Sequence, residues 1–410
     1  MERAAELALI RRMLAHLAAG TTDAADRPLL LPAFHHASAA HLERERQLFR
    51  GEPVAAALSS DLPTPGHTLA REIDGIPLLL VRGRDGVVRA FANACRHRGA
   101  PIATGAGEAA GGRLRCPFHA WTYDLEGALV AIPMGEAGYA SCDRARLGLR
   151  PRPCGEAGGV VLVRAEGDEP IDARAWLGPV ADDLDALGLA SFHLHASHRG
   201  SWQANWKLLL ETFLESYHVF SLHRETVHPH YFSLPMVADP LGLHLRFPVA
   251  RRTLAALRDR PESDWQLLAH ATVQWYLAPN ALLSATRDYA LLWRFESPAP
   301  NACSVETRFY TRSPVADDAA RKRFDDAFAL QLRVTGEEDF PMQEGIQRGL
   351  DAGAARELVI GTHEVGVVHL HQTLARMLGG TPLDGAGAEA NGCADASTRA
   401  RDFATREPRR

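Results

Sequence analysis

Four side chains of metal-binding type stand on two short segments of the sequence, and they constrain its fold more than any other feature. The first segment contains Cys95 and His97, separated by one residue. The second segment, C-P-F-H, contains Cys116 and His119. Both segments lie near Gly and Pro, between stretches of apolar, strand-type sequence, which is typical of loops between β-strands. The pattern therefore predicts a small β module in which two loops hold one metal group.

Two thiolates and two imidazoles suit two kinds of metal group. They can bind a tetrahedral zinc ion, or a [2Fe-2S] cluster with the cysteines on one iron and the histidines on the other. Zinc ligand pairs usually have spacers of two to four residues, whereas a single residue separates Cys95 from His97. The short spacer favours the cluster, and a structural zinc ion is the alternative.

A second group of metal-binding residues lies in the segment N-W-K-L-L-L-E-T-F-L-E-S-Y-H-V-F-S-L-H, which we expect to be helical over residues 206–220. Glu215 and His218 are three residues apart and share one face of such a helix. The next histidine, His223, lies about 140° further around an ideal helix. Both imidazoles therefore reach one metal only if the helix widens or breaks near residues 219–222, and such irregular turns are common at functional sites.

Two histidines and one carboxylate that leave coordination positions open suit a non-haem iron(II) ion that activates oxygen. His218 and His223 supply the imidazoles, although His228 and His230 follow closely as rivals. The carboxylate has to come from another part of the chain, and composition does not choose it. The segment G-E-E-D-F-P-M-Q-E-G offers four candidates: Glu337, Glu338, Asp339 and Glu344.

The bulk properties of the chain exclude several classes of protein. Its 410 residues predict two or three domains. The formal net charge of −5 gives no reason to expect nucleic acid or an anionic membrane as a partner. No apolar run approaches the roughly 18 residues of a membrane-spanning helix, and the N-terminus is typical of an amphipathic helix rather than a secretory signal. Six cysteines do not make a disulfide framework, so we expect a cytoplasmic protein whose clustered cysteines bind metal.

The order of strand-like and helix-like segments predicts an α+β fold. Short strands and turns fill roughly residues 69–163, including a hairpin around the turn at residues 84–86. Extended stretches at residues 243–313 suggest an antiparallel sheet, and helical sequence follows at residues 317–350 and 367–378. A small all-β module is therefore inserted near the front of a larger α+β domain.

Together these segments resemble the catalytic α subunits of Rieske non-haem iron oxygenases of the aromatic-ring-hydroxylating type, over roughly residues 45–380. C-x-H followed by C-P-F-H-A-W-T-Y-D-L-E-G is similar to the cluster-binding motif of this family. N-W-K…E…Y-H-x-x-x-x-H is similar to its iron-binding helix, and E-D…Q-R-G-L to its C-terminal ligand segment. The resemblance implies two sets of ligands: Cys95, His97, Cys116 and His119 for a Rieske [2Fe-2S] cluster, and His218, His223 and Asp339 for a mononuclear Fe(II) ion.

The resemblance also implies how the chain is divided into domains. We expect an N-terminal helical segment at residues 1–44 that packs on the catalytic domain, and an all-β Rieske [2Fe-2S] domain at residues 45–165. A larger, helix-grip-type catalytic domain with an antiparallel sheet follows at residues 166–380. Residues 381–410, which are rich in Gly and Ala and then charged, are expected to form a disordered tail.

Two polar residues receive catalytic roles from the resemblance. Asn205 matches an asparagine of the family that lies near the iron without being a firm ligand. Glu215 stands where the family most often has Asp, at the carboxylate position that links the two metal sites. In the homotrimer that the resemblance implies, Glu215 joins His97 or His119 of one subunit to His218 of the next. A glutamate at this position is similar to a subset of homotrimeric members.

The function implied by the resemblance is that of a terminal oxygenase component. Electrons from NAD(P)H reach it through a flavin-dependent reductase, with or without a ferredoxin, and O2 is used to hydroxylate a small organic substrate. We expect an aromatic substrate, as in aromatic hydrocarbon catabolism, and either dioxygenase or monooxygenase chemistry. The alternative is a Rieske monooxygenase or demethylase acting on a methyl ether or a quaternary amine, which the glutamate at position 215 favours. Outside this family, the alternatives are an electron-carrying ferredoxin and a zinc protein with a hydrolase or lipid-binding domain.

Overall fold

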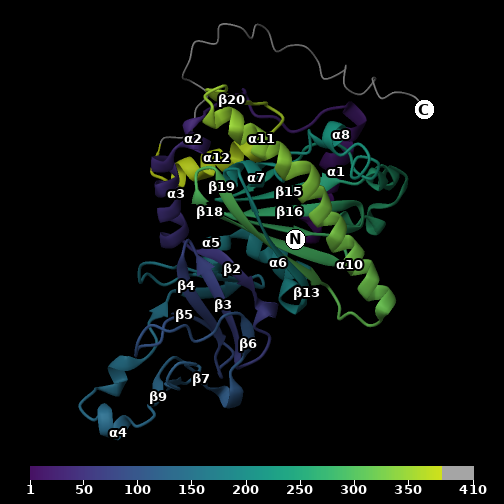
Figure 1. Cartoon of the computed structure of the whole chain (residues 1–410). Coiled ribbons are helices and arrows are strands. Elements are labelled where there is room, and N and C mark those ends of the chain that lie inside the picture. Colours follow the sequence, from purple (N-terminus) through teal and green to yellow (C-terminus); the bar gives the residue numbers. More distant parts are fainter. Residues whose placement is uncertain (381–410) are drawn as a thin grey trace.

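The computed structural model describes residues 1–380, so the tail predicted at residues 381–410 lies outside the described residues. The chain forms a small β lobe and a larger α+β lobe, stacked along one long axis (Figure 1). An all-β module thus stands beside a domain with a seven-stranded antiparallel sheet, which confirms the predicted fold class. Within residues 1–380, none of the helices has the length and apolar character needed to cross a bilayer.

The small lobe consists of three antiparallel sheets that pack apolar side chains between them. The predicted hairpin is confirmed: β4 and β5 pair around the turn, where Gly86 adopts a φ of 80° that favours glycine. The strand orders are β10-β5-β4-β3-β6, β11-β12-β2 and β7-β8-β9. The bounds are β2 (Val54–Leu58), β3 (His67–Ile73), β4 (Ile76–Arg82), β5 (Val88–Ala92), β6 (Ala106–Glu108), β7 (Leu114–Arg115), β8 (Thr122–Tyr123), β9 (Leu129–Ala131), β10 (Pro151–Arg152), β11 (Cys154–Ala157) and β12 (Val160–Val163).

The large lobe is built on the seven-stranded sheet, in the order β13-β19-β18-β17-β16-β15-β14. Neighbouring strands in this sheet are mostly consecutive in the sequence, so most connections are hairpins. The exception is β13, which pairs with β19 because the helical iron-binding segment intervenes after it. The bounds are β13 (His193–Trp202), β14 (Asp239–Leu241), β15 (His244–Ala250), β16 (Ala271–Leu277), β17 (Ala281–Ala285), β18 (Tyr289–Ala299) and β19 (Ala302–Thr311).

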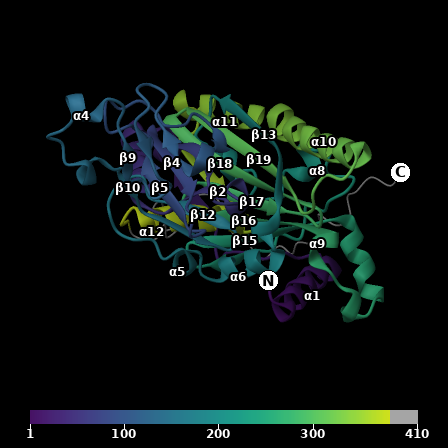
Figure 2. The same ribbon diagram turned by 90° about the horizontal axis from the view of Figure 1, so that it is seen from below.

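Both faces of this sheet are apolar and covered, which explains its near-continuous hydrophobic strands. On β18, Leu291, Trp293 and Phe295 point to one face, while Ala290 and Leu292 point to the other. The face that carries Trp293 is called the inner face here, because it packs against the helices of the iron-binding segments. Figure 2 shows α10 and α11 along one side of the sheet and α5 and α6 along the other. The bounds are α5 (Ala173–Leu177), α6 (Pro179–Leu187), α7 (Trp206–Glu211), α8 (Val219–Leu222), α10 (Asp318–Arg333), α11 (Phe340–Asp351) and α12 (Val365–Met377).

The first part of the chain belongs spatially to the large lobe. Helix α1 (Arg3–Ala19) packs its apolar side on the outer face of the sheet, and Arg12 bridges Asp23 and Asp239. Strand β1 (Leu29–Pro32) pairs with β20 (Glu357–Ile360) near the C-terminal end of the described chain. Contacts between distant parts of the sequence therefore hold the N-terminal segment in place.

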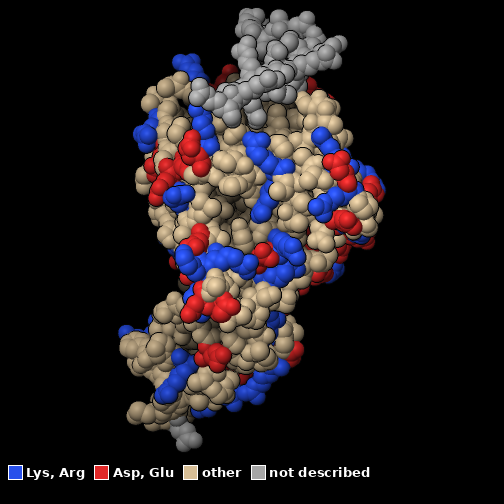
Figure 3. Space-filling view, turned by 90° about the vertical axis from the view of Figure 1, so that its right-hand side faces the viewer, with Lys and Arg blue, Asp and Glu red and all other residues tan. Residues whose placement is uncertain are grey.

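The two lobes meet at a waist that is rich in charged side chains. Arg71 of the small lobe lies 2.8 Å from Glu306 of β19, and Arg308 lies 2.6 Å from Asp61. Figure 3 shows basic and acidic side chains side by side on the surface at this waist. These ion pairs are largely buried, so they fix the orientation of the small lobe against the sheet.

The iron-binding segment is not one long helix, which corrects the prediction for residues 206–220. Helix α7 stops at Glu211, turns follow to residue 218, and α8 begins at Val219. The break therefore precedes His218 instead of falling at residues 219–222. Within the break, the Glu215 side chain accepts the backbone N–H of His218 in place of a helical carbonyl.

The C-terminal acidic segment contains a second irregular turn. Between α10 and α11 the chain forms a π-helical turn, η7, at Val334–Asp339. Pro341 follows at the start of α11, and its missing N–H cannot bond to the carbonyl of Glu337 as an α-helix requires. The wider turn ends on Asp339 and turns its carboxylate toward the iron-binding segment, as π-turns often do at functional sites.

A buried ion pair fastens α3 (Ala39–Gly51) to α7. Lys207 Nζ lies 2.7 Å from Glu45 Oε1, and Trp206 Nε1 donates to Glu45 Oε2 over 2.9 Å. Although burial alone would raise it, the Lys207 ammonium lowers the pKa of Glu45 from 4.5 to about 2. The folded pKa is lower than the unfolded one, so this pair stabilises the fold fully above about pH 4.5 and loses that effect as the pH falls toward 2.

Lys207→Met is expected to lower the free energy of unfolding by about 3 to 5 kcal/mol, because it leaves the Glu45 carboxylate buried without its cation. Urea denaturation at pH 7 measures the change. The double variant Glu45→Leu, Lys207→Met removes both charges and is expected to recover most of the loss. Equal destabilisation of the single and double variants would contradict an ionic role for the pair.

Candidate metal centres

The two Cys/His loops of the small lobe are tight turns that close on themselves. After β5, Cys95 donates its N–H to Ala100 O over 2.8 Å. After β7, Cys116 donates its N–H to Trp121 O over 2.8 Å, and Ala120 takes a positive φ of 57° within that turn. The Cys and His of each loop are therefore held by local backbone hydrogen bonds, as the sequence pattern predicted.

The two loops bring their donor atoms together in a pattern that fits a two-iron group. His97 Nδ1 and His119 Nδ1 lie 3.1 Å apart, close to the separation of about 3 Å expected for two nitrogens at right angles on one metal with bonds of about 2.1 Å. Cys95 and Cys116 are buried beside them. Within residues 1–380, no three of these four donors come within 4.8 Å of one another, which argues against one zinc ion shared by all four.

Tyr123 orients the sulfur side of this site. Its hydroxyl lies 3.2 Å from Cys95 Sγ and accepts the backbone N–H of Arg96 over 3.0 Å. Because the hydroxyl accepts from Arg96, its proton is available to the sulfur. Hydrogen bonds to cluster sulfurs stabilise the more negative, reduced state.

Tyr123→Phe is expected to lower the reduction potential of the cluster by about 40 mV, the equivalent of about 1 kcal/mol for one lost hydrogen bond. Protein-film voltammetry measures the potential. Tyr217→Phe, on the exposed surface of the large lobe, is the matched control. A potential that stays unchanged or rises in the Tyr123 variant would contradict donation to the sulfur.

The outer nitrogens of the two small-lobe histidines differ in their surroundings. His97 stacks on Trp121, and its Nε2 lies 3.2 Å from the Tyr139 hydroxyl. His119 instead lies against Phe118, which is 55% exposed. Among the described residues, no hydrogen bond involves the outer nitrogen of His119. The outer nitrogen of His97 therefore has a polar contact within the subunit, whereas His119 lies beside an exposed aromatic side chain.

In the large lobe, the break after α7 and the π-turn before α11 bring three donor atoms together. His218 Nε2 lies 3.2 Å from His223 Nε2, and His223 Nε2 lies 2.9 Å from Asp339 Oδ1. The third separation, His218 Nε2 to Asp339 Oδ1, is 3.5 Å. These spacings match three neighbouring positions around one metal with bonds of about 2.1 Å. This group of His218, His223 and Asp339 is called the triad below.

Two carboxylates fix the triad histidines from outside. Glu215 contacts Nδ1 of His218 through a very short hydrogen bond, and Glu338 Oε2 lies 2.7 Å from Nδ1 of His223. Thr226 donates to the same Glu338 oxygen over 2.8 Å. Each imidazole therefore donates its Nδ1–H outward and turns the Nε2 lone pair toward the centre, which is how outer carboxylates prepare metal-binding histidines.

The centre of the triad is suited to a cation. When both imidazoles are neutral and protonated on Nδ1, neither Nε2 carries a proton to donate, and Asp339 Oδ1 is buried without a hydrogen-bond donor. Burial raises the pKa of the Asp339 carboxyl even though His223 lies beside it. Two lone pairs and a buried carboxylate facing one another repel unless a metal ion lies between them. The donor set of two imidazoles and one carboxylate fits non-haem iron(II).

A second three-donor group, His36, Glu211 and His371, lies deeper in the lobe. Glu211 Oε1 accepts from His36 Nε2 over 2.7 Å and from His371 Nε2 over 2.8 Å. Both histidines can donate here, so the carboxylate is satisfied without a metal, and the two histidines hold the pKa of Glu211 far below its usual range against the effect of burial. We interpret this group as a structural link between α2 (Phe34–Ala37), α7 and α12.

Asn205 is not one of the three triad donors, in keeping with the expectation that it is not a firm ligand, and its side chain has a second role. Its Oδ1 accepts the N–H of Lys207 as the N-cap of α7, and its Nδ2 donates to His36 O and Pro300 O. The side chain is buried and its hydrogen-bonding atoms are used within the protein. Its surroundings therefore support a capping role and not a catalytic one.

The rival ligands considered from the sequence lie elsewhere. His228 Nε2 contacts Arg252 Nη2 over 3.0 Å, Glu337 is exposed, and Glu344 accepts the backbone N–H of Gln203. Glu338, which composition could not separate from Asp339, contacts His223 from outside. The π-turn that ends at Asp339 separates the two carboxylates, and Pro341 is the residue in the sequence that indicates an irregular turn there.

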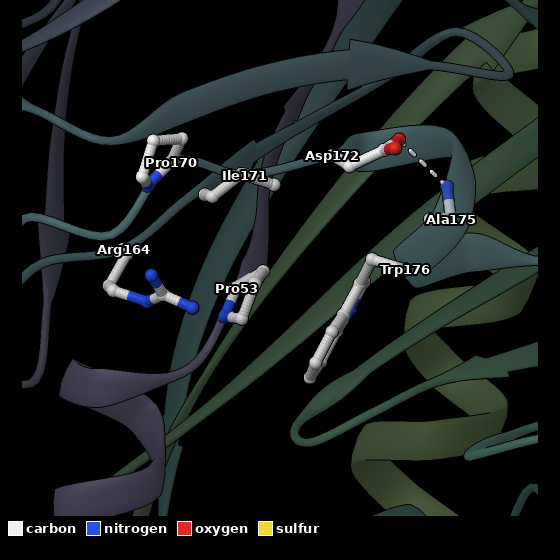
Figure 4. Close-up of a pocket in the computed structure, with 7 residues that line it drawn as sticks. All are labelled: Pro53, Arg164, Pro170, Ile171, Asp172, Ala175 and Trp176. Carbon is white, nitrogen blue, oxygen red and sulfur yellow. Dashed lines mark hydrogen bonds between the residues drawn. The ribbon is translucent and has the colours of Figure 1, made fainter.

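A cavity of about 310 Å³ lies at the junction of the two lobes, away from the triad. Figure 4 shows Arg164, Pro53 and Trp176 around it, with Asp172 bonded to Ala175 at its edge. None of the triad residues lines this cavity. It is therefore separate from the metal centres described above.

Comparisons with known proteins agree with this arrangement. The family described as Rieske [2Fe-2S] domain matches residues 52–141, and the family described as ring hydroxylating alpha subunit (catalytic domain) matches residues 187–380. The chain is 34% identical over 183 residues to the glycine betaine monooxygenase oxygenase subunit of Chromohalobacter salexigens, which covers 44% of this chain and 40% of that protein. It is 25% identical over 338 residues to the chloroplastic choline monooxygenase of Beta vulgaris, which covers 80% of this chain and 72% of that protein.

The fold is also shared with a solved structure, that of the quaternary ammonium Rieske monooxygenase CntA. The TM-score is 0.73 at 20% identity, covering 87% of this chain and 96% of that chain. The two lobes and their metal centres thus define a Rieske non-haem iron oxygenase. The chain belongs to the ring-hydroxylating α-subunit family of these enzymes, which carry a Rieske [2Fe-2S] cluster and a mononuclear iron.

Proposed function

We propose that this chain is the terminal oxygenase component of a monooxygenase that acts on a small quaternary ammonium compound. The observation that carries the proposal is the similarity to proteins named for glycine betaine and choline, over 44% and 80% of this chain. Glu215, in place of the more common aspartate, points the same way. The aromatic substrate expected from the sequence, and a place in aromatic hydrocarbon catabolism, have no comparable support among these relatives.

We assign the metal ligands from the geometry given above. Cys95, Cys116, His97 and His119 would hold the [2Fe-2S] cluster, and the triad would hold the mononuclear iron. When bound, these groups supply electron transfer and oxygen activation. The protein's own contribution is to hold the ligand histidines in one orientation through Glu215 and Glu338, and to keep the third ligand, Asp339, shielded from water.

Electron transfer in a homotrimer, with Glu215 between two subunits, is part of the proposal. Within the subunit, Glu215 already contacts His218 Nδ1 and accepts its backbone N–H over 3.1 Å. Between His97 and His119, the surroundings favour His119 as the partner from the next subunit, because Tyr139 occupies the outer nitrogen of His97. The exposed Phe118 beside His119 is the kind of apolar side chain that an interface covers.

A separate reductase is the proposed electron donor. The matched relative from Chromohalobacter salexigens is named as an oxygenase subunit, and such a subunit needs another protein to deliver electrons from NAD(P)H. A flavin-dependent reductase, with or without a ferredoxin between, fills this role. Measurements with the chain alone should therefore show no NAD(P)H oxidation.

Substrate-dependent oxygen consumption tests the proposed function. The purified chain, loaded with iron and supplied with a flavin-dependent reductase and NADH, is offered glycine betaine, choline, benzoate and an aromatic methyl ether. Turnover of a quaternary ammonium compound, with one atom of labelled O2 in the organic products, is expected. Two labelled atoms in an aromatic product would instead establish a ring dioxygenase and overturn the proposal.

A further inference from the structure

One part of the inner face is open, although the sheet is otherwise covered there. Val249, Thr272, Gln274 and Tyr289 lie on the inner face of three central strands, yet each is only half-buried. Further along the same face, Trp293 is 1% exposed. Val249 pairs with Thr272 in adjacent strands, so the accessible positions are neighbours. Solvent or a small molecule therefore reaches this region, which is called the open patch below.

The open patch lies beside the chain segment that leaves the triad. The carbonyl of His223 accepts the N–H groups of Val227 and His228, and the N–H of Tyr231 donates to the carbonyl of Val227. Two successive turns thus connect His223 to Tyr231. Tyr231 forms a β-bridge with Arg251, the residue that follows β15. At about 1.5 Å per residue in helical turns, the eight residues from His223 to Tyr231 span on the order of 12 Å.

Three polar atoms around the open patch are completely buried and unpaired. They are Ser233 Oγ, Arg251 Nε and Gln274 Oε1, which make no hydrogen bond within residues 1–380. More than nine-tenths of buried polar groups in native proteins have a partner. Their gathering beside an accessible region indicates a place that ordered water or a ligand completes.

Arg251 supplies the charge of the open patch. Its backbone is extended, with φ −75° and ψ 152°. Residues two apart in extended backbone point to the same face, so the Arg251 side chain points to the inner face, as that of Val249 does. The guanidinium lies 5.5 Å from the centre of the Tyr231 ring, and the Tyr231 hydroxyl lies 2.9 Å from Thr272 Oγ1. Within residues 1–380, no carboxylate forms an ion pair with Arg251.

Tyr289 completes this surface from β18. Burial raises its pKa to about 12, while the positive charge of Arg251 opposes the rise. The hydroxyl is therefore protonated at neutral pH and can donate a hydrogen bond. An arginine with a free planar fork, flanked by tyrosine hydroxyls, is the arrangement with which proteins bind carboxylates.

We propose that Arg251, with Tyr231 and Tyr289, binds the carboxylate of the substrate. The inference rests on the proposed function and narrows it: the substrate is a quaternary ammonium compound that also carries a carboxylate, such as a betaine, and not choline. The zwitterion would direct its carboxylate toward Arg251 and its N-methyl groups toward the side of the open patch that faces the triad. An ammonium compound without a carboxylate leaves the half-buried guanidinium without an anion and adds a second positive charge near it.

Binding measurements with matched ligands test this inference without relying on turnover. Isothermal titration calorimetry under anaerobic conditions gives the Kd of glycine betaine, its methyl ester, choline and benzoate on the iron-loaded protein. The wild type is expected to bind glycine betaine at least about 10-fold more tightly than its ester, which has lost the carboxylate charge. Arg251→Gln is expected to weaken glycine betaine about 10- to 100-fold and to leave the ester unchanged. Arg251→Lys keeps the charge but not the fork, so it should fall between the two.

The control is Arg260→Gln, an exposed arginine of the same region, which should leave every Kd unchanged. Unchanged ester binding also shows that the Arg251 variant is folded. The inference is wrong if Arg251→Gln weakens the binding of glycine betaine and of its ester equally, or if it weakens neither. This holds even if the enzyme turns over quaternary ammonium compounds. If benzoate alone binds, and does so through Arg251, the carboxylate site stands and the proposed substrate class fails.

Discussion

Asp339→Ala is expected to lower the iron content from about three to about two atoms per chain and to abolish substrate-dependent oxygen consumption. The reason is that Asp339 is the only carboxylate in the triad, lying 2.9 Å from His223 Nε2 and 3.5 Å from His218 Nε2. The two histidines alone hold iron(II) weakly. Iron analysis of the purified variant and an oxygen electrode measure the two effects.

The visible and electron paramagnetic resonance spectra of the cluster should be unaffected in the Asp339 variant, because its ligands lie in the other lobe. Glu337→Ala is the matched control: it removes a carboxylate two residues away that is exposed, and it should keep full iron content and activity. Loss of activity in both variants, or full iron content without Asp339, would show that another residue is the third ligand.

Glu215→Gln is expected to keep both metals and the affinity for substrate while lowering turnover by roughly 10- to 100-fold. The glutamine still reaches His218 but carries no charge, so its hydrogen bond with the Nδ1–H of His218 is weaker than that of the carboxylate. If Glu215 also joins His119 of a neighbouring subunit, electron transfer between the two centres slows as well. Stopped-flow oxidation of the pre-reduced protein, in the presence of substrate and O2, measures this step.

The control for the Glu215 variant is Glu225→Gln, which changes an exposed carboxylate close by in the sequence. It should oxidise at the wild-type rate. A Glu215 variant that re-oxidises normally would contradict a bridging role and leave Glu215 only as a support for His218. A variant that loses its mononuclear iron would show that the carboxylate is needed for metal binding itself.

The cluster ligands could be predicted from the sequence because each Cys/His pair lies within one turn. Local hydrogen bonds such as Cys116 N–H to Trp121 O decide the position of both side chains of a pair. The pairing of His218 with His223 was predicted for the same reason, although the position of the break was not. Within the break, the Glu215 side chain accepts the His218 N–H, and helix propensities do not include such a side-chain hydrogen bond.

The sequence did not reveal roles that depend on contacts between segments far apart in the chain. Composition alone did not separate Glu338 from Asp339; the family resemblance selected Asp339, and the π-turn is the physical reason that its carboxylate faces inward. No pattern in the sequence indicated that Asn205 caps α7. The partners of Glu211 in α2 and α12 lie 175 and 160 positions away, beyond any local pattern. Nothing in the sequence distinguished Arg251 from the other arginines of the chain, because its surroundings are set by residues of other segments such as Tyr231 and Tyr289.

The sequence by itself determined the two kinds of metal chemistry, because Cys, His and carboxylate side chains at short spacings have few other uses in combination. It also determined the fold class through its alternation of strand-like and helix-like segments. The tertiary structure alone decided that a π-turn brings Asp339 to the two histidines while Glu338 contacts His223 from outside. It also decided that the Tyr139 hydroxyl contacts the outer nitrogen of His97, whereas no hydrogen bond within the described chain reaches that of His119, and that Arg251 faces an open part of the inner face. Each of these depends on contacts between segments far apart in the chain, whose positions are set by packing and not by local spacing.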